Sequence, residues 1–372
     1  MQSGTNDPLS GASLADAHPF GLAEKLDRWG GEELILRRDG PTGAWIVIAL
    51  HSSVMGPPTG GTRFKPYPDL DAAIADALRL SEGMTHKYAV AGFPRGGGKA
   101  VIHAPIPLDP AARAGLLRRY GSVLSRLGGT FQTGPDVGTS SEDMDVIGEN
   151  GAPWVFARTP AAGGAGSSGP YTALGVFAGI RAACTHVFGG EGLRGRTVLV
   201  QGAGSVGERL ITLLRSAGAS VCFSDVDPEC ARRIREQEAV PLVEPEAVYG
   251  TACDVFAPCA LGAVLNERTI PLLSCRLVAG GANNQLAGEA DGTRLHERGI
   301  LYVPDYAVNI GGAMAITGIE AMGWTPSEAE RRVVESVERA VGRLLELVER
   351  EGVLPEVAAR SLARERLAAA SA

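Results

Sequence analysis

Two lysines, Lys87 and Lys99, are spaced so that they could do chemistry together. Lys99 follows three consecutive glycines, Gly96 to Gly98, and precedes Ala100-Val101-Ile102, which predicts a short buried strand. We expect the glycines to let the backbone pass close to a ligand, and Lys99 to leave the strand end into a cleft. Partial desolvation there favours the neutral, proton-accepting form of a lysine. A solvated lysine after an ordinary loop is the alternative that these residues alone leave open.

The stretch around Lys99 does not fit a phosphate-binding P-loop. That motif requires glycine where this chain has Phe93, and serine or threonine where it has Ala100. We therefore exclude a P-loop.

Two further polar residues stand beside glycines. Asp136 lies in Gly134-Pro135-Asp136-Val137-Gly138, and Asn309 precedes Gly311 and Gly312. Either residue could be a turn former, because Asp and Asn hydrogen-bond their own backbone in turns. Each could instead contact a ligand that the glycines allow to approach.

A dinucleotide-binding fingerprint follows in the second half of the chain. The apolar run Thr197–Val200 predicts a buried strand, which enters a glycine-rich turn and a helix. A second strand ends at Asp225, close to the distance expected for the acid that binds ribose hydroxyls. A carboxylate there repels a 2′-phosphate, so NAD is favoured over NADP. The expected cofactor contacts in this turn and in later strand ends are Gly202, Gly204, Ser205, Val206, Gly207, Asp225, Cys259, Ala260, Ala282 and Asn283.

Composition limits the class of protein. The chain has 372 residues, 45% hydrophobic and 21% charged, which indicates a globular protein of two domains. A net charge of −7 argues against nucleic-acid partners and against binding to a membrane surface. The six cysteines form no Cys-x-x-Cys pair and no zinc-ligand pattern, so we expect no metal and a reducing compartment. We see no signal peptide in the small, polar arm of residues 1–20, and expect a cytoplasmic protein.

Local patterns predict the elements that would position these residues. We expect strands at 34–36, 45–50 and 130–133, and a loop at 57–62 whose glycines approach another group. A helix capped by Asp69 or Asp71 would carry Lys87 near its C-terminal end. The predicted fold is α/β with two domains and a cleft between them. An N-terminal α/β substrate and oligomerisation domain spans 1–150, a Rossmann NAD-binding domain spans 151–324 with a glycine-rich hinge at 163–169, and C-terminal helices at 325–372 pack back on the first domain.

The motifs, taken in order, resemble the glutamate/leucine/phenylalanine/valine dehydrogenase family, closest to its phenylalanine and leucine enzymes. The resemblance spans about residues 56–323. It is carried by Gly60-Gly61-Thr62-Arg63, Met84-Thr85-His86-Lys87, Gly96-Gly97-Gly98-Lys99, Thr133-Gly134-Pro135-Asp136-Val137-Gly138-Thr139, Thr172-Ala173-Leu174-Gly175, Ala257-Pro258-Cys259-Ala260, Ala282-Asn283-Asn284, Pro304-Asp305-Tyr306 and Asn309-Ile310-Gly311-Gly312.

The resemblance implies reversible, NAD-dependent oxidative deamination of an L-amino acid to a 2-oxo acid and ammonia. It gives Lys99 the role of general acid and base toward water, and Asp136 that of exchanging protons with the amino group. It also implies a homo-oligomer, a dimer or larger. The matching substrate-binding positions are Lys87, Gly61, Pro135 and Asn309, and the matching nicotinamide contacts are Thr172 and Asn283.

Four positions match the family's side-chain pocket: Thr59, Gly134, Ala313 and Ile316. Gly134 and Ala313 are small, as in the phenylalanine enzymes, so we expect a large apolar, aromatic substrate. Thr59 and Arg95 depart from the family pattern. The alternatives are a branched-chain (leucine or valine) dehydrogenase and a non-catalytic NAD-binding sensor. An amine dehydrogenase disagrees with the presence of Lys87 and Asn309.

Overall fold

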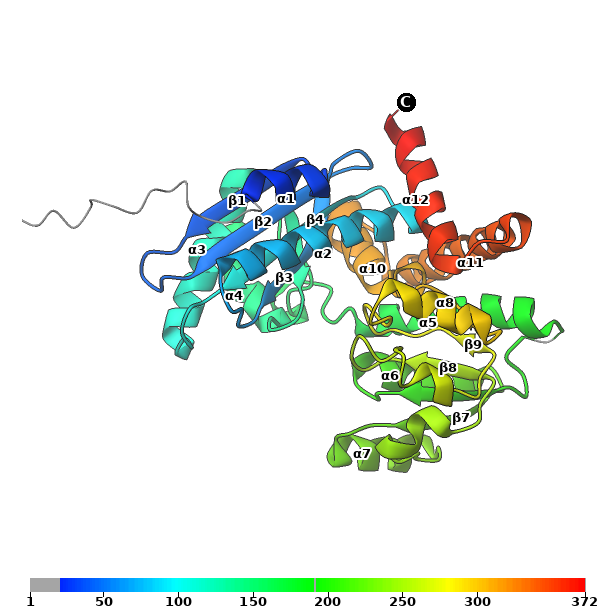
Figure 1. Ribbon diagram of the computed structural model, residues 1–372. Helices are drawn as coiled ribbons and strands as arrows, with labels where there is room; N and C mark the ends of the chain where they lie inside the picture. The colour runs from blue at the N-terminus through cyan, green and yellow to red at the C-terminus, as the bar shows by residue number, and fades with distance from the viewer. Residues whose placement is uncertain (1–20, 191, 372) are drawn as a thin grey trace, which may run out of the picture.

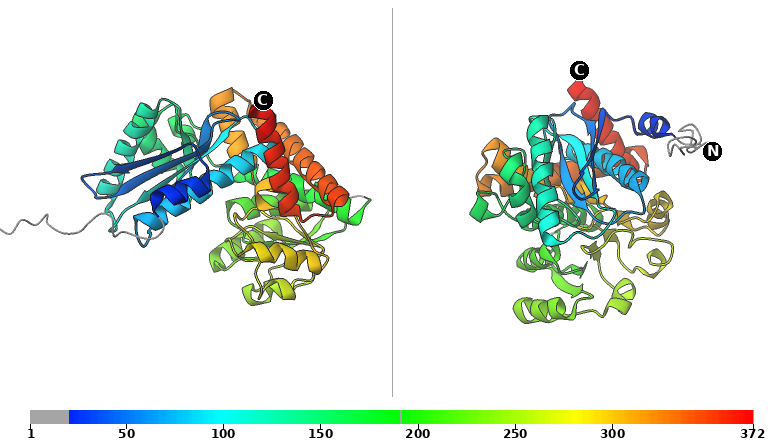
Figure 2. Two further views of the ribbon diagram at one scale, coloured as in Figure 1. Left: turned by 45° about the horizontal axis from the view of Figure 1, so that its top comes forward. Right: turned by 90° about the vertical axis from the view of Figure 1, so that its left-hand side faces the viewer.

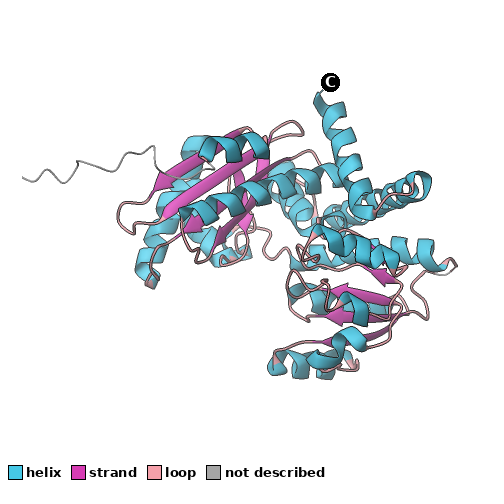
Figure 3. Ribbon diagram, viewed as in Figure 1, coloured by secondary structure: helices cyan, strands magenta, loops and turns pink. Residues whose placement is uncertain are grey.

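The computed structural model describes residues 21–190 and 192–371, and the predicted N-terminal arm at 1–20 lies outside them. It contains two separate five-stranded sheets, each covered by helices (Figures 1 and 3). The two-domain α/β architecture predicted from the sequence is confirmed. The first sheet has the order β1-β2-β4-β3-β5, formed by β1 (Glu33–Arg38), β2 (Trp45–Ser52), β3 (Pro58–Phe64), β4 (Gly96–His103) and β5 (Gln132–Pro135).

Strand β2 shows how the first domain is layered. Its alternate residues Ile46, Ile48 and Leu50 pack with helices α3 (Pro110–Leu127) and α4 (Ser141–Gly151). Val47 and Ala49 face the opposite side, where they pack with helix α2 (Leu70–Ala91) and with Trp29 of α1 (Leu22–Trp29). This period of two places one apolar layer on each face of the sheet.

Helix α2 carries Lys87 near its C-terminal end, as predicted. The Asp69 side chain accepts the backbone N–H of Ala72 at 2.8 Å and caps the N-terminus, and Gly92 ends the helix in the left-handed conformation. Asp69, and not Asp71, is therefore the N-cap of α2.

The glycine run before Lys99 makes room for other parts of the protein, and not for a ligand as predicted. The glycines lie inside strand β4, and Lys99 sits in the middle of that strand opposite Ala49, not at its end. A Cβ on Gly97 would lie 2.1 Å from Thr85 Oγ1, and one on Gly98 would lie 2.8 Å from the Phe131 ring. The glycines therefore let α2 and a neighbouring side chain press onto the sheet, and the prediction of close ligand approach was wrong.

Two neighbouring predictions are also corrected. The segment 57–62 is not a loop but most of β3, because Gly60 must fit against the backbone of β4: a Cβ there would lie 1.8 Å from Gly98 O. Strand β5 begins two residues later than predicted and includes Gly134 and Pro135.

The second sheet is entirely parallel, with the order β10-β9-β8-β6-β7. Its strands are β6 (Thr197–Gln201), β7 (Ser220–Ser224), β8 (Val255–Pro258), β9 (Leu277–Val278) and β10 (Leu301–Tyr302). The helices of this part are α5 (Gly169–Phe188), α6 (Ser205–Ser216), α7 (Pro228–Glu238), α8 (Glu289–Glu297), α9 (Asp305–Val308) and α10 (Gly311–Met322).

Two C-terminal helices connect the two parts of the chain. Helix α11 (Pro326–Glu351) packs on α5 and α10, and α12 (Pro355–Ser371) packs on α2 (Figure 2). Arg366 donates to Ala89 O at 2.9 Å and Ser336 donates to Ala91 O at 2.7 Å, which satisfies carbonyls left open at the end of α2. The division into 1–150, 151–324 and 325–372 stays a prediction. Within the described ranges, no helix has the length and hydropathy to cross a membrane.

Candidate active site

A cleft of about 790 Å³ opens between the two sheets. Strands β3, β4 and β5 and helix α2 form one wall, and α5, α10 and the loops after the second sheet form the other. The structure brings together in this cleft the predicted residues Thr59, Gly61, Lys87, Lys99, Gly134, Pro135, Asp136, Thr172, Val206, Asn283, Asn309, Ala313 and Ile316.

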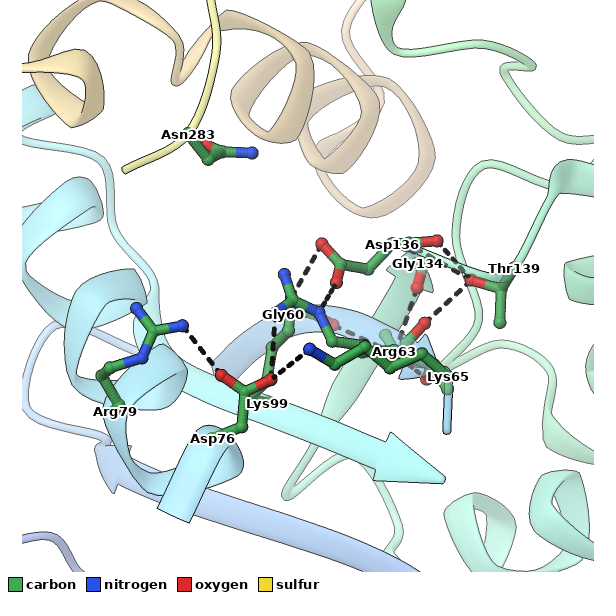
Figure 4. Close-up of polar contacts among 12 residues, drawn as sticks. Gly60, Arg63, Lys65, Asp76, Arg79, Lys99, Gly134, Asp136, Thr139 and Asn283 are labelled. Carbon is green, nitrogen blue, oxygen red and sulfur yellow. Dashed lines mark hydrogen bonds and ion pairs between the residues drawn. The ribbon is translucent and has the colours of Figure 1, made fainter. Parts of the chain in front are cut away.

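Lys99 and Asp136 form a buried ion pair at the base of the cleft. Lys99 is 4% exposed, and its Nζ lies 3.0 Å from Asp136 Oδ1 (Figure 4). A Cβ on Gly61 would lie 2.8 Å from the Asp136 Cβ and 3.3 Å from Lys99 Nζ, so a side chain there would displace the pair. Asn283 stands across from this pair, on a segment of the second domain.

Arg63 completes the charge arrangement, although no role for it was predicted from the sequence. Its Nε lies 2.7 Å from Asp136 Oδ2, and its guanidinium also contacts Asp76 Oδ2 at 3.0 Å. Tyr67 donates to the same Asp76 oxygen at 2.7 Å. Arg63 lies two residues after Gly61 on a strand, hence on the same face. This two-residue spacing along a strand is the sequence feature from which the position of Arg63 could have been predicted.

Burial and charge set the protonation of this group. Burial lowers the pKa of Lys99 below its usual value of 10.5, and the charge of Arg63 lowers it further, while Asp136 opposes both. Burial raises the pKa of Asp136, but the charges and hydrogen bonds of Lys99 and Arg63 outweigh it and lower that pKa to about 2. Asp136 is therefore ionised at neutral pH, and Lys99 loses its proton more easily than a lysine in water.

Lys87 is the cation that faces the open cleft. Among the described residues, its ammonium has no hydrogen bond or ion pair, although protein surrounds it closely. Burial lowers the pKa of Lys87 to about 8, and the neighbouring Asp305 carboxylate opposes that change. Asp305 itself accepts the backbone N–H of Asn284 at 3.0 Å. An ammonium without a partner is suited to bind a substrate carboxylate.

Asn309 presents an unused acceptor to the same cleft. Its Nδ2 donates to Asn283 Oδ1 at 2.9 Å and to Gly281 O at 3.3 Å. Its Oδ1 is buried and has no hydrogen-bond partner in the described part of the chain. A buried acceptor of this kind is costly unless a ligand completes it, and a substrate amino group would do so.

The end of the cleft has mainly apolar walls. Phe156, Ala157 and Ile316 form one buried cluster, and Gly134 leaves room, since a Cβ there would have Phe156 O as its nearest neighbour at 3.7 Å. The Thr59 hydroxyl donates to Pro57 O at 2.9 Å and is thus satisfied. Phe156 and Ala157 carried no signal in the sequence, because an irregular segment brings them here.

Tyr88 and Thr317 add two polar groups to this end of the cleft. The Tyr88 hydroxyl hydrogen-bonds to Thr317, and both side chains are buried. Neither was predicted from the sequence, since their contact joins α2 to α10 and depends on tertiary packing. Arg95, which departs from the family pattern, does not line the cleft.

The glycine-rich turn after β6 fits a dinucleotide. Gly202 has a φ of +91°, and a Cβ there would lie 2.7 Å from the Ala260 Cβ, as a tight turn requires. Gly204 has nothing within 4 Å of its Cβ position, which leaves the N-terminus of α6 open to a pyrophosphate. A Cβ on Gly207 would lie 1.9 Å from Gly202 O, so glycine allows the helix to approach the strand. These three properties match the three glycine roles of the fingerprint.

Asp225 and several other predicted cofactor residues lie beside the main cleft and do not line it. Asp225 directly follows β7 and accepts the N–H of Ala203 at 2.6 Å and of Asp227 at 2.9 Å. It borders a separate groove next to Val226, whose side chain is 82% exposed. The other residues at these strand ends that do not line the cleft are Gly202, Gly204, Ser205, Gly207, Cys259, Ala260 and Ala282. Within residues 21–190 and 192–371, no cluster of three His, Cys, Asp or Glu residues could hold a metal.

A parallel dinucleotide-type sheet that faces a buried lysine–aspartate pair across a cleft defines a two-domain dehydrogenase. Comparison with known proteins identifies the family. Residues 40–151 match the family model "Glu/Leu/Phe/Val dehydrogenase, dimerisation domain", and residues 228–372 match "Glutamate/Leucine/Phenylalanine/Valine dehydrogenase". The chain belongs to this family and is an NAD-dependent amino acid dehydrogenase, an oxidoreductase acting on CH–NH2 groups.

Relatives of known name cover nearly the whole chain. Leucine dehydrogenase of Bacillus cereus is 39% identical over 93% of both chains, and valine dehydrogenase of Streptomyces albus is 40% identical over 93% of this chain and 94% of its own. Among solved structures, L-tryptophan dehydrogenase from Nostoc punctiforme is 36% identical, with a TM-score of 0.81, covering 94% of this chain and 99% of that one.

Proposed function

We propose that the enzyme catalyses the reversible oxidative deamination of a branched-chain L-amino acid, of the leucine or valine type, to the 2-oxo acid and ammonia. The observation that carries this proposal is the buried Lys99–Asp136 pair beside the unpartnered Lys87 ammonium, in a cleft that faces the nucleotide sheet. The relatives named leucine and valine dehydrogenases support the branched-chain substrate. They do not support the aromatic substrate expected from the sequence.

Substrate binding follows from the groups that line the cleft. Lys87 pairs with the substrate carboxylate, assisted by the backbone at Gly61. The free Oδ1 of Asn309 and the carbonyl of Pro135 accept hydrogen bonds from the amino group. The side chain then extends along Gly134 toward Phe156 and Ile316, where apolar contact stabilises it.

Proton transfer is assigned to the buried pair. Asp136, ionised at neutral pH, accepts a proton from the substrate amine and stabilises the positive charge that develops on nitrogen. Lys99, once neutral, activates the water that attacks the resulting iminium carbon. Arg63 holds Asp136 in place through its Nε.

The second domain holds the cofactor. NAD supplies the acceptor for the hydride that leaves the substrate α-carbon. The turn Gly202–Gly207 would hold its pyrophosphate, Asp225 its ribose hydroxyls, and Thr172 with Asn283 its carboxamide. A carboxylate at Asp225 would repel a 2′-phosphate, so we expect NAD to be preferred over NADP.

An aromatic L-amino acid is the second candidate. The open space at Gly134 and the small Ala313 favour it, and so does the similarity to a tryptophan dehydrogenase. We expect Tyr88 and Thr317, which hydrogen-bond to each other and also line the cleft, to limit the length of the substrate side chain and so to decide between the two candidates.

The purified enzyme should be assayed by NADH absorbance with L-leucine, L-valine, L-phenylalanine and L-tryptophan, each with NAD and with NADP. We expect the highest kcat/KM with leucine or valine and NAD. A preference for phenylalanine or tryptophan would favour the second candidate. Binding of NAD without turnover of any amino acid would support a sensor and contradict the proposal.

The proposal includes a homo-oligomer and a cytoplasmic location. The dimerisation domain of the family supports a homo-oligomer. All six cysteines are free thiols, which is consistent with a reducing compartment, and we place the enzyme in the cytoplasm.

A further inference from the structure

One carboxylate from α10 holds the segment that joins the two domains. Glu320 Oε1 accepts the backbone N–H of Ala157 at 3.0 Å and that of Ala165 at 2.8 Å. The glutamate is partly buried, and burial raises its pKa while the two N–H groups lower it. A single oxygen therefore fixes both ends of the loop that runs from 157 to 165.

The loop between these two residues is compact. Gly166 N–H donates to Arg158 O at 3.0 Å, and a Cβ on Gly164 would lie 2.2 Å from the same oxygen. On the side of the first domain, Asp145 of α4 accepts the Thr159 N–H at 2.8 Å and its hydroxyl at 2.7 Å. Asp145 therefore anchors the loop to the first domain at Thr159, and Glu320 anchors it to α10 at Ala157 and Ala165. Only Arg158 separates Ala157 from Thr159.

The residues next to the Glu320 contact form a wall of the side-chain pocket. Phe156 and Ala157 line the cleft and pack with Ile316 in one buried cluster, with Ala165 against it. Ile316 and Glu320 lie four residues apart on α10 and thus on one face of the helix. Ala157 has a φ of +56°, a conformation that alanine rarely adopts and that its surroundings must maintain.

We propose that Glu320 is a positioning residue that sets the side-chain pocket by holding the Phe156–Ala157 wall against α10. This inference rests on the proposed function and assigns a specificity role that the catalytic groups do not supply. Loss of the carboxylate leaves two N–H groups without an acceptor, so the loop relaxes and the wall moves away from Ile316. Lys87 and Lys99 stand on α2 and β4, and Asp136 directly follows β5; Glu320 hydrogen-bonds to none of the three. The Phe156 N–H, next to the Glu320 contact, donates to Thr133 O of β5 at 2.7 Å, so Glu320 holds the Ala157 side of the wall.

The test compares Glu320→Ala and Glu320→Gln with the wild-type enzyme. We expect Glu320→Ala to raise KM for L-leucine about tenfold, because the side chain loses its wall, with kcat changed much less. KM for L-2-aminobutyrate, whose side chain is too short to reach the wall, and the Kd for NAD should stay within about twofold. Glu320→Gln keeps an acceptor oxygen and should restore KM for leucine to near the wild-type value.

Asp254→Ala is a matched control. Asp254 is also a partly buried carboxylate that accepts one backbone N–H, from Thr197 at 2.8 Å, but it precedes β8 at the end of the sheet away from the cleft. We expect this variant to lower the melting temperature and to leave the ratio of leucine to aminobutyrate KM unchanged. If Glu320→Ala does not fold, Glu320→Asp, which withdraws the carboxylate by one methylene, carries the same test.

Three outcomes would overturn the inference. They are an unchanged KM for leucine in Glu320→Ala, an equal loss for both amino acids and NAD, and a Glu320→Gln variant as impaired as Glu320→Ala. These results presuppose an active wild-type enzyme. A wild-type enzyme that turns over no amino acid would contradict the proposed function instead, and with it any pocket for such a substrate.

Discussion

At the scale of single residues, Asp136 lies between two cations, Lys99 and Arg63, that differ in how readily they lose a proton. Each occupies a separate carboxylate oxygen, at 3.0 and 2.7 Å. The charge on Arg63 is permanent at any working pH, whereas Lys99 sits in surroundings that weaken its hold on a proton. Arg63 therefore keeps Asp136 ionised when Lys99 becomes neutral, and this permits both groups to be deprotonated at the same time.

Removal of the lysine amine should stop turnover without loss of the cofactor. We expect Lys99→Ala to lower kcat by about 10³-fold or more, because the amine that activates water is removed. NAD affinity, measured by calorimetry, should stay unchanged. Lys65→Ala is the control, since Lys65 is 42% exposed and contacts the outer Asp76 at 3.9 Å. Near-normal turnover in Lys99→Ala would remove Lys99 from the mechanism.

The charge on Arg63 should be visible in the pH profile. Arg63 lowers the pKa of Lys99, so Arg63→Met should raise that pKa and move the rising limb of kcat to higher pH. Arg63→Lys retains a positive charge and should shift the limb less. A limb that does not move in Arg63→Met would mean that the titrating group is not Lys99.

Lys87 should make carboxylate binding sensitive to alkali. With a pKa of about 8, it loses its charge as pH rises through that value. The Ki of 4-methylpentanoate, which has a carboxylate but no amino group, should therefore increase by up to about tenfold per pH unit above 8. Lys87→Arg keeps its proton throughout and should give a flat profile. A flat profile in the wild-type enzyme would show that Lys87 does not bind the carboxylate.

Candidate site residues could be predicted from the sequence where their chemistry or a regular local spacing marked them. The fingerprint glycines and Asp225 are local. Lys87 and Lys99 stood out by their spacing, Asp136 and Asn309 by the glycines beside them, and the family resemblance gave these four their roles. The roles of Phe156, Tyr88 and Glu320 could not be predicted, since they arise from contacts between segments far apart in the chain. Their side chains carry no periodic signal, and only the fold shows which groups they meet.

At the scale of elements, the helix α2 and strand β4 illustrate why the glycine run was misinterpreted. Three glycines indicate close approach, but the sequence does not say what approaches. The structure shows that it is the helix backbone at Thr85 and the ring of Phe131. Strand and helix existence was predicted well from apolar patterns, while the register of one element on another depends on tertiary packing.

A methyl group placed at this contact should test it. A Cβ at Gly97 would meet Thr85 N at 2.3 Å, and backbone cannot easily move away. We expect Gly97→Ala to lower the free energy of unfolding by about 1–3 kcal/mol or more, measured by urea denaturation. Gly342→Ala in α11, where nothing lies within 4 Å, should instead raise it by roughly 0.5–1 kcal/mol. Equal effects would show that α2 does not press on β4.

At the scale of the whole molecule, the first sheet ends in an edge strand. In the described structure β1 pairs only with β2, and most of its side chains are exposed. An unprotected edge of this kind is a common site of association between chains. The family model that matches residues 40–151, which hold the rest of this sheet and begin just after β1, is described as a dimerisation domain.

We expect sedimentation velocity at micromolar concentration to give a mass that is a multiple of 38.6 kDa. Association should also slow hydrogen exchange of β1 amides relative to dilute samples. A sharp single species at 38.6 kDa over the whole concentration range would contradict the oligomer.

The groups that handle protons and those that select the side chain have separate origins. The first come from the first sheet and the helix on it, while much of the second comes from α10 and the loop at 156–165, beside Thr59 and Gly134 of the sheet. Substitutions in α10 and in this loop can therefore accumulate without misaligning the groups that handle protons. An engineer, or a lineage under selection, can exchange one amino acid substrate for another by altering a single helix face and one loop, while the reaction itself is inherited intact.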